Sequence, residues 1–292
     1  MPVAALRAPL ACTAEIVMKL ELFQVTGSFK ARGAMNRHLV GGATSPAGIV
    51  TASGGNHGLA VARTAHAAGT RATIFVPGTV RPEKVLNMRA WGATVEIVGE
   101  EWSVSNEAAL AFATKTGASY FHPFADPLVV AGQGTLGLEI LEQIAGLDAI
   151  IVAIGGGGLI SGLATAVKAM KPQIHIIGVE PEGSPTLAAS LAANRRVRLD
   201  AVTSRVATMS CRETDERIFQ TVRQHVDSVL LVSDDDMLAA SRWLWTEFAI
   251  AADLSGAASI AALQRWPARF EGVGKVCALI CGAGPDGIGD AP

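Results

Sequence analysis

A regular alternation of short Ile- and Val-rich segments with longer segments of helical periodicity runs along the chain and limits it to few folds. Several short segments, such as 149–154, are apolar at every position, which is typical of parallel strands that helices cover on both faces. Strands that alternate with helices predict an open parallel sheet with right-handed crossovers. The predicted strands are 16–22, 48–53, 72–76, 94–98, 149–154, 175–179, 229–232 and 276–280, and the predicted helices include 56–68, 82–91, 105–116, 134–144 and 159–170.

Length and composition narrow the class of protein. A chain of 292 residues fits one large or two ordinary domains, and the segment 45–124 could form a separate small lobe before a turn-rich stretch at 122–134. The near balance of 24 Lys+Arg against 26 Asp+Glu gives no sign of a nucleic-acid partner. Four cysteines without a CxxC pair are no disulfide framework, so we expect a cytoplasmic protein.

One uncharged stretch, 149–167, approaches the length of a membrane span. Four consecutive glycines interrupt it, and glycine disrupts a helix interior. A buried strand, a glycine turn and a buried helix explain the stretch better, so we expect no membrane partner. The N-terminal residues also lack the apolar run of a signal peptide.

The first candidate functional motif is Thr26-Gly27-Ser28-Phe29-Lys30, which follows the first predicted strand. It opens a helix that we expect to run to about Leu39, with Lys30 about one turn inside it. A lysine amine in a partly apolar site has a lowered pKa and can attack an aldehyde. The alternative is a solvent-facing lysine, which is the usual environment of this residue type.

The second motif is a run of small and polar residues directly after the strand 48–53: Ser53, Gly54, Gly55, Asn56, His57 and Gly58. Small residues let backbone N–H groups approach an anion, and the dipole of the helix that starts near Asn56 favours a carboxylate or phosphate. A tight turn with Asn56 as the helix N-cap is an equally good interpretation.

The third motif is the glycine run Gly155, Gly156, Gly157 and Gly158, followed by Leu159. Four glycines between a strand and a helix predict a phosphate cradle, although neither a P-loop nor a dinucleotide fingerprint is present. A fourth motif, Cys281-Gly282-Ala283-Gly284, follows the last strand. A free cysteine there is most often a small buried residue before a turn.

Other polar residues point to structure rather than chemistry. No His, Cys, Asp and Glu set has zinc spacing, and we expect no metal. The run Asp234-Asp235-Asp236 after Ser233 predicts an acidic helix N-terminus. His122, which precedes Pro123, could line a site or be structural.

Taken together and in order, these motifs resemble the fold-type II pyridoxal 5'-phosphate (PLP) enzymes, in particular the threonine/serine dehydratase and serine racemase group. The stretch 19–34, the loop 53–58, His122-Pro123-Phe124, the run 131–135 and Gly155 to Leu159 carry the resemblance over nearly the whole chain. It implies an α/β fold with two open, mostly parallel twisted sheets flanked by helices. It also implies a small domain 45–124 and a large PLP-binding domain made of 1–44 and 125–292.

The resemblance implies roles for single residues. Lys30 would carry PLP covalently and, once freed, act as the catalytic base at Cα. Phe29, Asn56 and Cys281 would contact the cofactor ring, and Gly155, Gly156, Gly157, Gly158 and Leu159 its phosphate. The small amino-acid substrate would be bound by Ser53, Gly54, Gly55, Asn56 and His57. The implied reaction is loss of water from L-threonine or L-serine, giving 2-oxobutanoate or pyruvate plus ammonia, in a homodimer.

Departures from the group's pattern refine this expectation. Racemases of the group carry a serine, as a second acid/base, at the position of Gly54, which cannot move a proton. Elimination is therefore expected rather than racemisation. Glu180 matches one ligand of the group's cation site, but Thr186 replaces an expected Asp, and the segment 199–217 diverges. The alternatives are another PLP enzyme, such as a hydroxyaspartate or hydroxyectoine-pathway dehydratase or a threonine or cysteine synthase-like enzyme, and a PLP-binding protein without activity.

Overall fold

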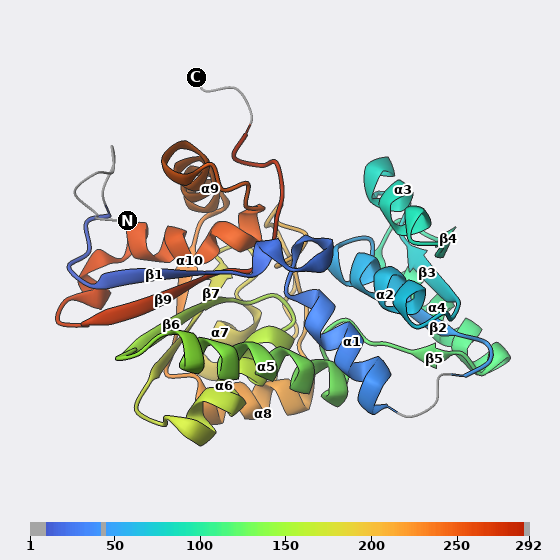
Figure 1. Cartoon of the computed structure of the whole chain (residues 1–292), viewed down its shortest axis with the longest axis horizontal. Coiled ribbons are helices and arrows are strands. Elements are labelled where there is room, and N and C mark those ends of the chain that lie inside the picture. Colours follow the sequence, from blue (N-terminus) through green and yellow to red (C-terminus); the bar gives the residue numbers. More distant parts are fainter. Residues whose placement is uncertain (1–9, 42–44, 289–292) are drawn as a thin grey trace. The chain divides into compact units, whose positions relative to one another are not determined.

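Residues 10–41 and 45–288 are described by the computed structural model, in which the chain forms two compact units (Figure 1). The first unit is built from the residues up to 23 and from 134 onward, and the second from residues 24–133. The segment 45–124 lies wholly inside the second unit, which also includes helix α1 (Lys30–Val40) because α1 packs along α2 (Asn56–Ala67). The domain boundaries at 44/45 and 124/125 stay a prediction.

The first unit contains a five-stranded sheet in which all neighbouring strands are parallel. Its order places the first strand of the chain beside the last one. Figure 1 shows helices on both faces of this sheet, α9 and α10 on one and α5, α6 and α8 on the other. The strand order is β1 (Glu15–Leu20), β9 (Lys275–Ile280), β6 (Ala149–Ala153), β7 (His175–Pro181) and β8 (Ser228–Val232).

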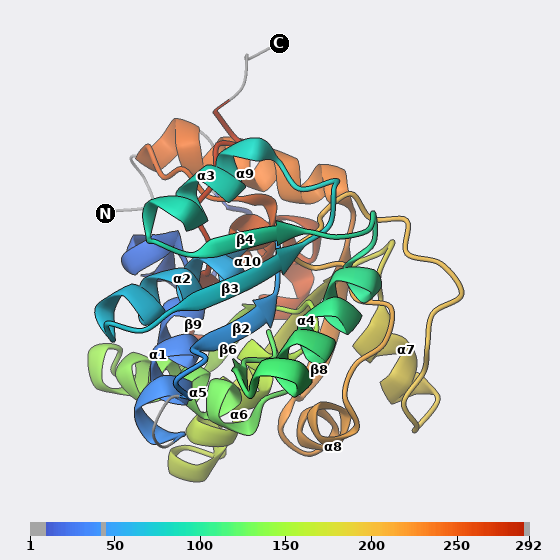
Figure 2. The same ribbon diagram turned by 90° about the vertical axis from the view of Figure 1, so that its right-hand side faces the viewer.

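The second unit contains a four-stranded sheet, also parallel throughout. Helices α2 and α3 lie against one face and α4 against the other (Figure 2). The strand order is β4 (Thr94–Ile97), β3 (Ala72–Val76), β2 (Ile49–Ala52) and β5 (Ser119–Tyr120), and the covering helices besides α2 are α3 (Pro82–Ala90) and α4 (Trp102–Thr116).

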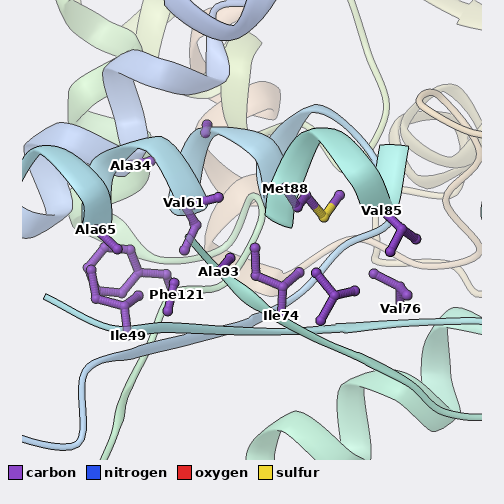
Figure 3. Packing of buried hydrophobic residues seen from close by; sticks show 14 residues of the cluster. Ala34, Ile49, Val61, Ala65, Ile74, Val76, Val85, Met88, Ala93 and Phe121 are labelled. Carbon is purple, nitrogen blue, oxygen red and sulfur yellow. The ribbon is translucent and has the colours of Figure 1, made fainter. Parts of the chain in front are cut away.

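The core of the second unit explains why β2 and β3 carry apolar residues on both of their faces. On β2, Ile49 packs into the cluster below α2 and α3, whereas its neighbour Val50 packs into the cluster below α4. The same alternation holds for Ile74 and Phe75 on β3. Figure 3 shows the first of these clusters, including Phe121. Because both faces are buried, an alternation of apolar and polar residues would leave one face unpacked.

The remaining helices include those predicted at 134–144 and 159–170. The uncharged stretch 149–167 forms β6, the glycine turn and most of α6. Among the residues that the structure describes, no helix is long and apolar enough to cross a bilayer. Asp234 to Asp236 form the first turn of α9, where Ser233 and Asp236 make a capping box. These helices are α5 (Pro127–Gln143), of which residues up to 133 belong to the second unit, α6 (Gly158–Met170), α7 (Thr186–Ala192), α8 (Glu216–His225), α9 (Asp234–Phe248) and α10 (Leu254–Arg265).

Three helix starts differ from the prediction, and one of them is that of α4, which begins at Trp102 rather than at 105. Helix α1 begins at Lys30 itself, not one turn earlier, because Thr26 and Gly27 have left-handed backbones (φ 67° and 76°) and Ser28 is extended. Helix α5 begins at Pro127, inside the stretch predicted to be turns, and the Asp126 side chain accepts a hydrogen bond from the Leu128 N–H (2.9 Å). An Asp before a Pro in the first turn is a recognisable start signal.

Candidate active site

The predicted site residues all lie after the carboxyl ends of parallel strands or at the start of a helix. The second unit holds Phe29 and Lys30 together with the loop of Ser53, Gly54, Gly55, Asn56 and His57. The first unit holds the other group, where the glycine run follows β6 and Cys281 follows the adjacent strand β9. Within each unit, adjacent parallel strands therefore place the predicted residues at one sheet edge, as expected for ligand sites in such sheets.

In the second unit, the Lys30 amine is held by a backbone carbonyl. Its Nζ donates a hydrogen bond to Pro123 O (2.7 Å), and it lies 5.1 Å from the ring centroid of Phe29. Pro123 belongs to the turn 121–125, which follows β5, the strand next to β2. Lys30 is thus half-buried and directed to the carboxyl edge of this sheet. The solvent-facing alternative for this lysine is wrong.

Polar side chains fix the turn 121–125. Phe121 O accepts hydrogen bonds from Thr51 Oγ1 (2.7 Å) and from His57 Nε2 (3.1 Å). His122 Nδ1 accepts from the N–H groups of Phe124 (3.2 Å) and Ala125 (2.9 Å). The carbonyl that meets Lys30 is therefore set by contacts from β2, from α2 and within the turn itself.

Aromatic rings surround His122 at the same edge. The ring of Phe124 meets it edge-on, with centroids 4.6 Å apart, and Tyr120 and Trp102 lie at 6.1 and 6.3 Å. Trp102 Nε1 donates to Ala52 O (2.9 Å), the last residue of β2 before the Ser53 loop. Rings are thus gathered beside the loop predicted to bind substrate.

His57 is a neutral imidazole. It is 2% exposed, and burial lowers its pKa to about 3, with the nearby Lys30 as the second cause. Because Phe121 O can only accept, His57 Nε2 carries the proton and Nδ1 is a bare acceptor. Nδ1 has no hydrogen-bond partner among the residues that the structure describes.

This burial makes folding stability depend on pH. Between pH 6.5 and 3 the unfolded chain binds a proton at His57 that the folded chain excludes, so stability falls as pH falls. The free energy of unfolding should fall from pH 7 to pH 5 in both proteins. We expect this fall to be about 2 kcal/mol smaller in His57→Gln than in the wild type. Urea unfolding at the two pH values measures this, with His66→Gln, an exposed histidine of α2, as control. Equal pH dependence in wild type and His57→Gln would contradict the assignment.

The Ser53 loop is shaped by close packing around its glycines. A Cβ on Gly54 would lie 2.7 Å from Val80 Cγ2, and one on Gly58 would lie 2.2 Å from Ser53 O. Gly55 is the N-cap residue of α2 and makes no side-chain cap, so Asn56 is the first helical residue and not the N-cap. The N–H groups at this helix start point along the positive end of the helix dipole. A carboxylate is therefore a suitable ligand for them.

In the first unit, the glycine run forms a tight cradle at the N-terminus of α6. Gly157 is its N-cap residue with φ +90°, and the helix begins at Gly158. A Cβ on Gly155 would lie 2.7 Å from Thr208 O, and one on Gly157 would lie 2.5 Å from Ile218 Cγ2. Thr214 Oγ1 donates to Gly156 O (3.0 Å), so it holds a carbonyl of the cradle in place.

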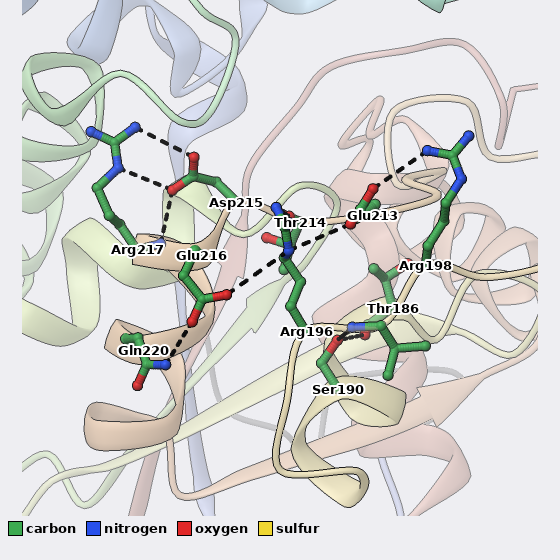
Figure 4. A network of polar contacts seen from close by, with 11 residues as sticks. Thr186, Ser190, Arg196, Arg198, Glu213, Thr214, Asp215, Glu216, Arg217 and Gln220 are labelled. Atoms are coloured by element: carbon green, nitrogen blue, oxygen red, sulfur yellow. Dashed lines mark hydrogen bonds and ion pairs between the residues drawn. The ribbon is translucent and has the colours of Figure 1, made fainter.

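The divergent segment 199–217 supplies two of these neighbours, Thr208 and Thr214, and a charged network fixes the segment (Figure 4). Arg196 lies 3.4 Å from Glu213 and 3.9 Å from Glu216, while Arg198 reaches the other oxygen of Glu213 (3.4 Å). Asp215 caps α8 by accepting from the Arg217 N–H (2.9 Å). The segment thus has a structural role beside the cradle, which its sequence did not reveal.

Cys281 lies in a turn buttressed by Asp253. The thiol is 2% exposed and donates to Ser255 O (3.4 Å), so its sulfur keeps a proton. Asp253 caps α10 and lies against Gly282 and Gly284, where a Cβ would overlap it. The turn after β9 therefore presents a neutral group at the edge next to the glycine cradle.

Glu180 caps the short helix α7. Its carboxylate accepts from the N–H groups of Leu187 and Ala188 (2.8 Å each), and the Thr186 hydroxyl donates to Cys211 O. Burial raises the pKa of Glu180 to about 7. Within residues 10–41 and 45–288, no group of three His, Cys, Asp or Glu side chains could hold a metal ion.

Each group of residues, taken within its own unit, fits one part of PLP. Positions 155 and 157 of the cradle have no room for a side chain, and the amides at the start of α6 suit a phosphate. The Lys30 amine at a sheet edge suits an aldehyde, and the buried bare nitrogen of His57 lies in the same unit. Lys30, Asn56, the cradle and Cys281 would hold the group.

Some residues that shape the site were missed from the sequence. The carbonyls of Phe121 and Pro123 leave no signal in side-chain identity. Asp253 could have been found, because Asp-Leu-Ser-Gly before an apolar run is an N-cap signature. Thr214 could not, since it joins the cradle only through the folded segment.

The chain resembles known proteins over most of its length. A family model described as "Pyridoxal-phosphate dependent enzyme" matches residues 2–282. The L-threonine ammonia-lyase of Thermotoga maritima is 37% identical over 92% of this chain and 67% of its own length, so the chain spans about two thirds of that relative. The phenylserine dehydratase of Ralstonia pickettii is 36% identical over 92% of this chain and 82% of its own. A crystal structure of the T.th. threonine deaminase superposes with a TM-score of 0.88 at 37% identity, covering 96% of this chain and 90% of that one.

Proposed function

Because this chain belongs to the family of pyridoxal-phosphate dependent enzymes, we propose that it is an ammonia-lyase that converts L-threonine or L-serine to a 2-oxo acid and ammonia by elimination of the β-hydroxyl. The observation that carries the proposal is the Lys30 amine, half-buried and bound to Pro123 O at the edge of the Ser53 loop. Relatives named for the threonine reaction, at 37% identity, support it.

The chain's own residues supply the steps around the cofactor. PLP, when bound, supplies an electron sink that makes the Cα–H bond of an amino acid acidic. The N–H groups from Ser53 to Asn56 bind the substrate carboxylate, and the amides of 155–159 bind the phosphate. The Lys30 amine takes the Cα proton, and one proton is returned to the β-hydroxyl, which leaves as water. The released enamine then takes up one water and hydrolyses to a 2-oxo acid and ammonia. Phe29 packs beside the reacting amine, and the Cys281 thiol stays neutral.

Initial rates of ammonia and 2-oxo acid release from a panel of hydroxy-amino acids test the proposal. We expect the highest kcat/KM with L-threonine or L-serine. One methyl group separates them, which is worth about 1–3 kcal/mol in an apolar pocket. L-phenylserine belongs in the panel because Trp102, Tyr120 and Phe124 gather around His122. An absence of turnover on every member, with PLP bound, would contradict the lyase proposal and favour a binding protein.

Elimination rather than racemisation is the outcome that Gly54 supports, because glycine has no group to return a proton to the opposite face of Cα. We expect no D-serine at a rate near turnover. Restoring a serine should be costly, because its Cβ would meet Val80 Cγ2 at 2.7 Å. Gly54→Ser is expected to lower stability by about 1–3 kcal/mol.

The double variant Gly54→Ser/Val80→Ala tests whether overlap with Val80 causes the loss of stability in Gly54→Ser. Removal of Val80 Cγ2 should recover most of the lost stability. Urea unfolding of the four members of the cycle gives the coupling energy. Additive effects would show that Val80 is not what excludes a side chain at position 54.

We also propose that the protein works in the cytoplasm as a homodimer. The thiols of Cys12, Cys211, Cys277 and Cys281 are all free, which suits a reducing compartment. Phe23, with 73% of its surface exposed, and Leu39, with 70%, are apolar side chains that such an interface could cover. Light scattering of the purified chain measures the mass, and a monomer at micromolar concentration would contradict the dimer.

A further inference from the structure

The reactive amine of Lys30 is positioned by main chain rather than by a side chain. Its acceptor is Pro123 O at 2.7 Å. The proline ring limits φ at this residue, and the direction of its carbonyl depends on how the turn 121–125 is held. The direction in which Lys30 points therefore depends on whatever holds that turn.

One end of the turn is held by an imidazole. His57, on α2, donates from Nε2 to Phe121 O (3.1 Å). Thr51, on β2, donates from Oγ1 to the same oxygen (2.7 Å). The other end is closed by His122 Nδ1, which accepts two N–H groups of the turn. Of these three side chains, His57 is the one whose hydrogen bond comes from a helix packed along α1, the helix that carries Lys30.

The protonation of His57 is fixed by its surroundings. The Phe121 carbonyl requires a proton on Nε2, and the charged and titratable groups that face the ring, Lys30 and His122, both oppose a second proton. In the folded chain the ring is therefore a neutral one-proton donor across the neutral and mildly acidic pH range. A donor that keeps its charge over this range is suited to holding an amine that must change its own.

We propose that His57 is a positioning residue for Lys30, acting through the Phe121–Pro123 main chain and not through the substrate. This inference rests on the proposed function, because it gives Lys30 the role of the reacting amine. Loss of the Nε2–H···O bond leaves Thr51 alone on Phe121 O and lets Pro123 O move away from Nζ. The amine then spends less time in the geometry from which it meets an aldehyde.

The test measures the reactivity of Lys30 directly. The full chain, stripped of cofactor, is mixed with PLP and cyanoborohydride, and the rate of labelling at Lys30 is followed by peptide mass spectrometry from pH 6 to 9. His57→Phe keeps the ring but removes the donor. We expect its labelling rate at pH 8 to fall at least about tenfold, the equivalent of one pKa unit, or its pH profile to shift by that much.

Matched variants separate positioning from packing. His57→Gln can place an amide N–H where Nε2 lies and should stay within about threefold of wild type, whereas His57→Asn places its amide at Nδ1 and should behave as His57→Phe. Thr64→Val, another buried polar residue of α2, should leave the labelling profile unchanged. Where His57→Phe does not fold, the Gln and Asn variants decide the question.

An unchanged profile in folded His57→Phe, or equal profiles for Gln and Asn, overturns the proposal even if the wild type dehydrates threonine. Selective labelling of Lys30 with the predicted variant order supports it even if no hydroxy-amino acid is turned over. The two results distinguish a failure of the positioning role from a failure of the proposed lyase function.

Discussion

The Lys30→Ala variant is expected to release ammonia from L-threonine at least about 10³-fold more slowly than the wild type, within the range that removal of a general base produces. The loss should fall on kcat and on kcat/KM alike, because the amine acts on the reacting Cα–H bond. The fold should survive, since Lys30 is the first residue of α1, its side chain is only half-buried, and its amine bonds a turn carbonyl, Pro123 O, rather than the core.

The control for this loss is Lys115→Ala, which removes an exposed lysine from α4 in the same unit. Its rate should equal that of the wild type. Far-UV circular dichroism of both variants establishes that they are folded. A Lys30→Ala enzyme that keeps more than about one tenth of wild-type kcat, outside the range for a general base, would remove this residue from the chemistry.

A loss of both stability and cofactor affinity is expected when the glycine cradle is altered. Gly157→Ala places a Cβ at a left-handed backbone position, which costs about 1–2 kcal/mol. It also brings that Cβ within 2.5 Å of Ile218 Cγ2 and 3.0 Å of Leu187 Cδ1. Such an overlap costs about 1–3 kcal/mol more in a packed interior. The displaced cradle should also bind PLP with a clearly higher dissociation constant.

Gly146→Ala separates the backbone cost of Gly157→Ala from its overlap cost. Gly146 has a similar backbone (φ +69°), but no atom lies within 4 Å of its Cβ position. It should show only the backbone cost and an unchanged PLP affinity. Thermal unfolding and a cofactor titration measure both quantities, at roughly 2–4 °C per kcal/mol for chains of this size class. Equal PLP affinity for Gly157→Ala and wild type would exclude the cradle as the phosphate site.

The parallel architecture was predictable because its signal is in the side chains. Strands β2 and β6 are buried at every position; β6 is therefore an unbroken apolar run, and β2 is interrupted only by Thr51. The glycine run could be recognised for the same reason, since a Cβ at Gly155 or Gly157 would overlap its neighbours. A position whose packing accepts only one type of residue can be recognised from the sequence.

Other features could not be predicted, because they depend on main-chain conformation or on contacts between segments that are distant in the sequence. Strand β5 has two residues, too few to show a pattern, and yet it ends at the turn that holds Lys30. The start of α1 at Lys30 depends on the left-handed backbone of Thr26, a conformation that threonine seldom adopts. The role of Thr214 depends on a loop folded by ion pairs between residues far from any motif.

A proton NMR time course of L-threonine with the purified chain and PLP decides whether this protein is the lyase that its Lys30 site indicates. We predict 2-oxobutanoate and ammonia in equal amounts from the wild type, with none from Lys30→Ala. A folded, PLP-bound wild type that leaves L-threonine intact, or converts it only to another stereoisomer, would contradict the assignment.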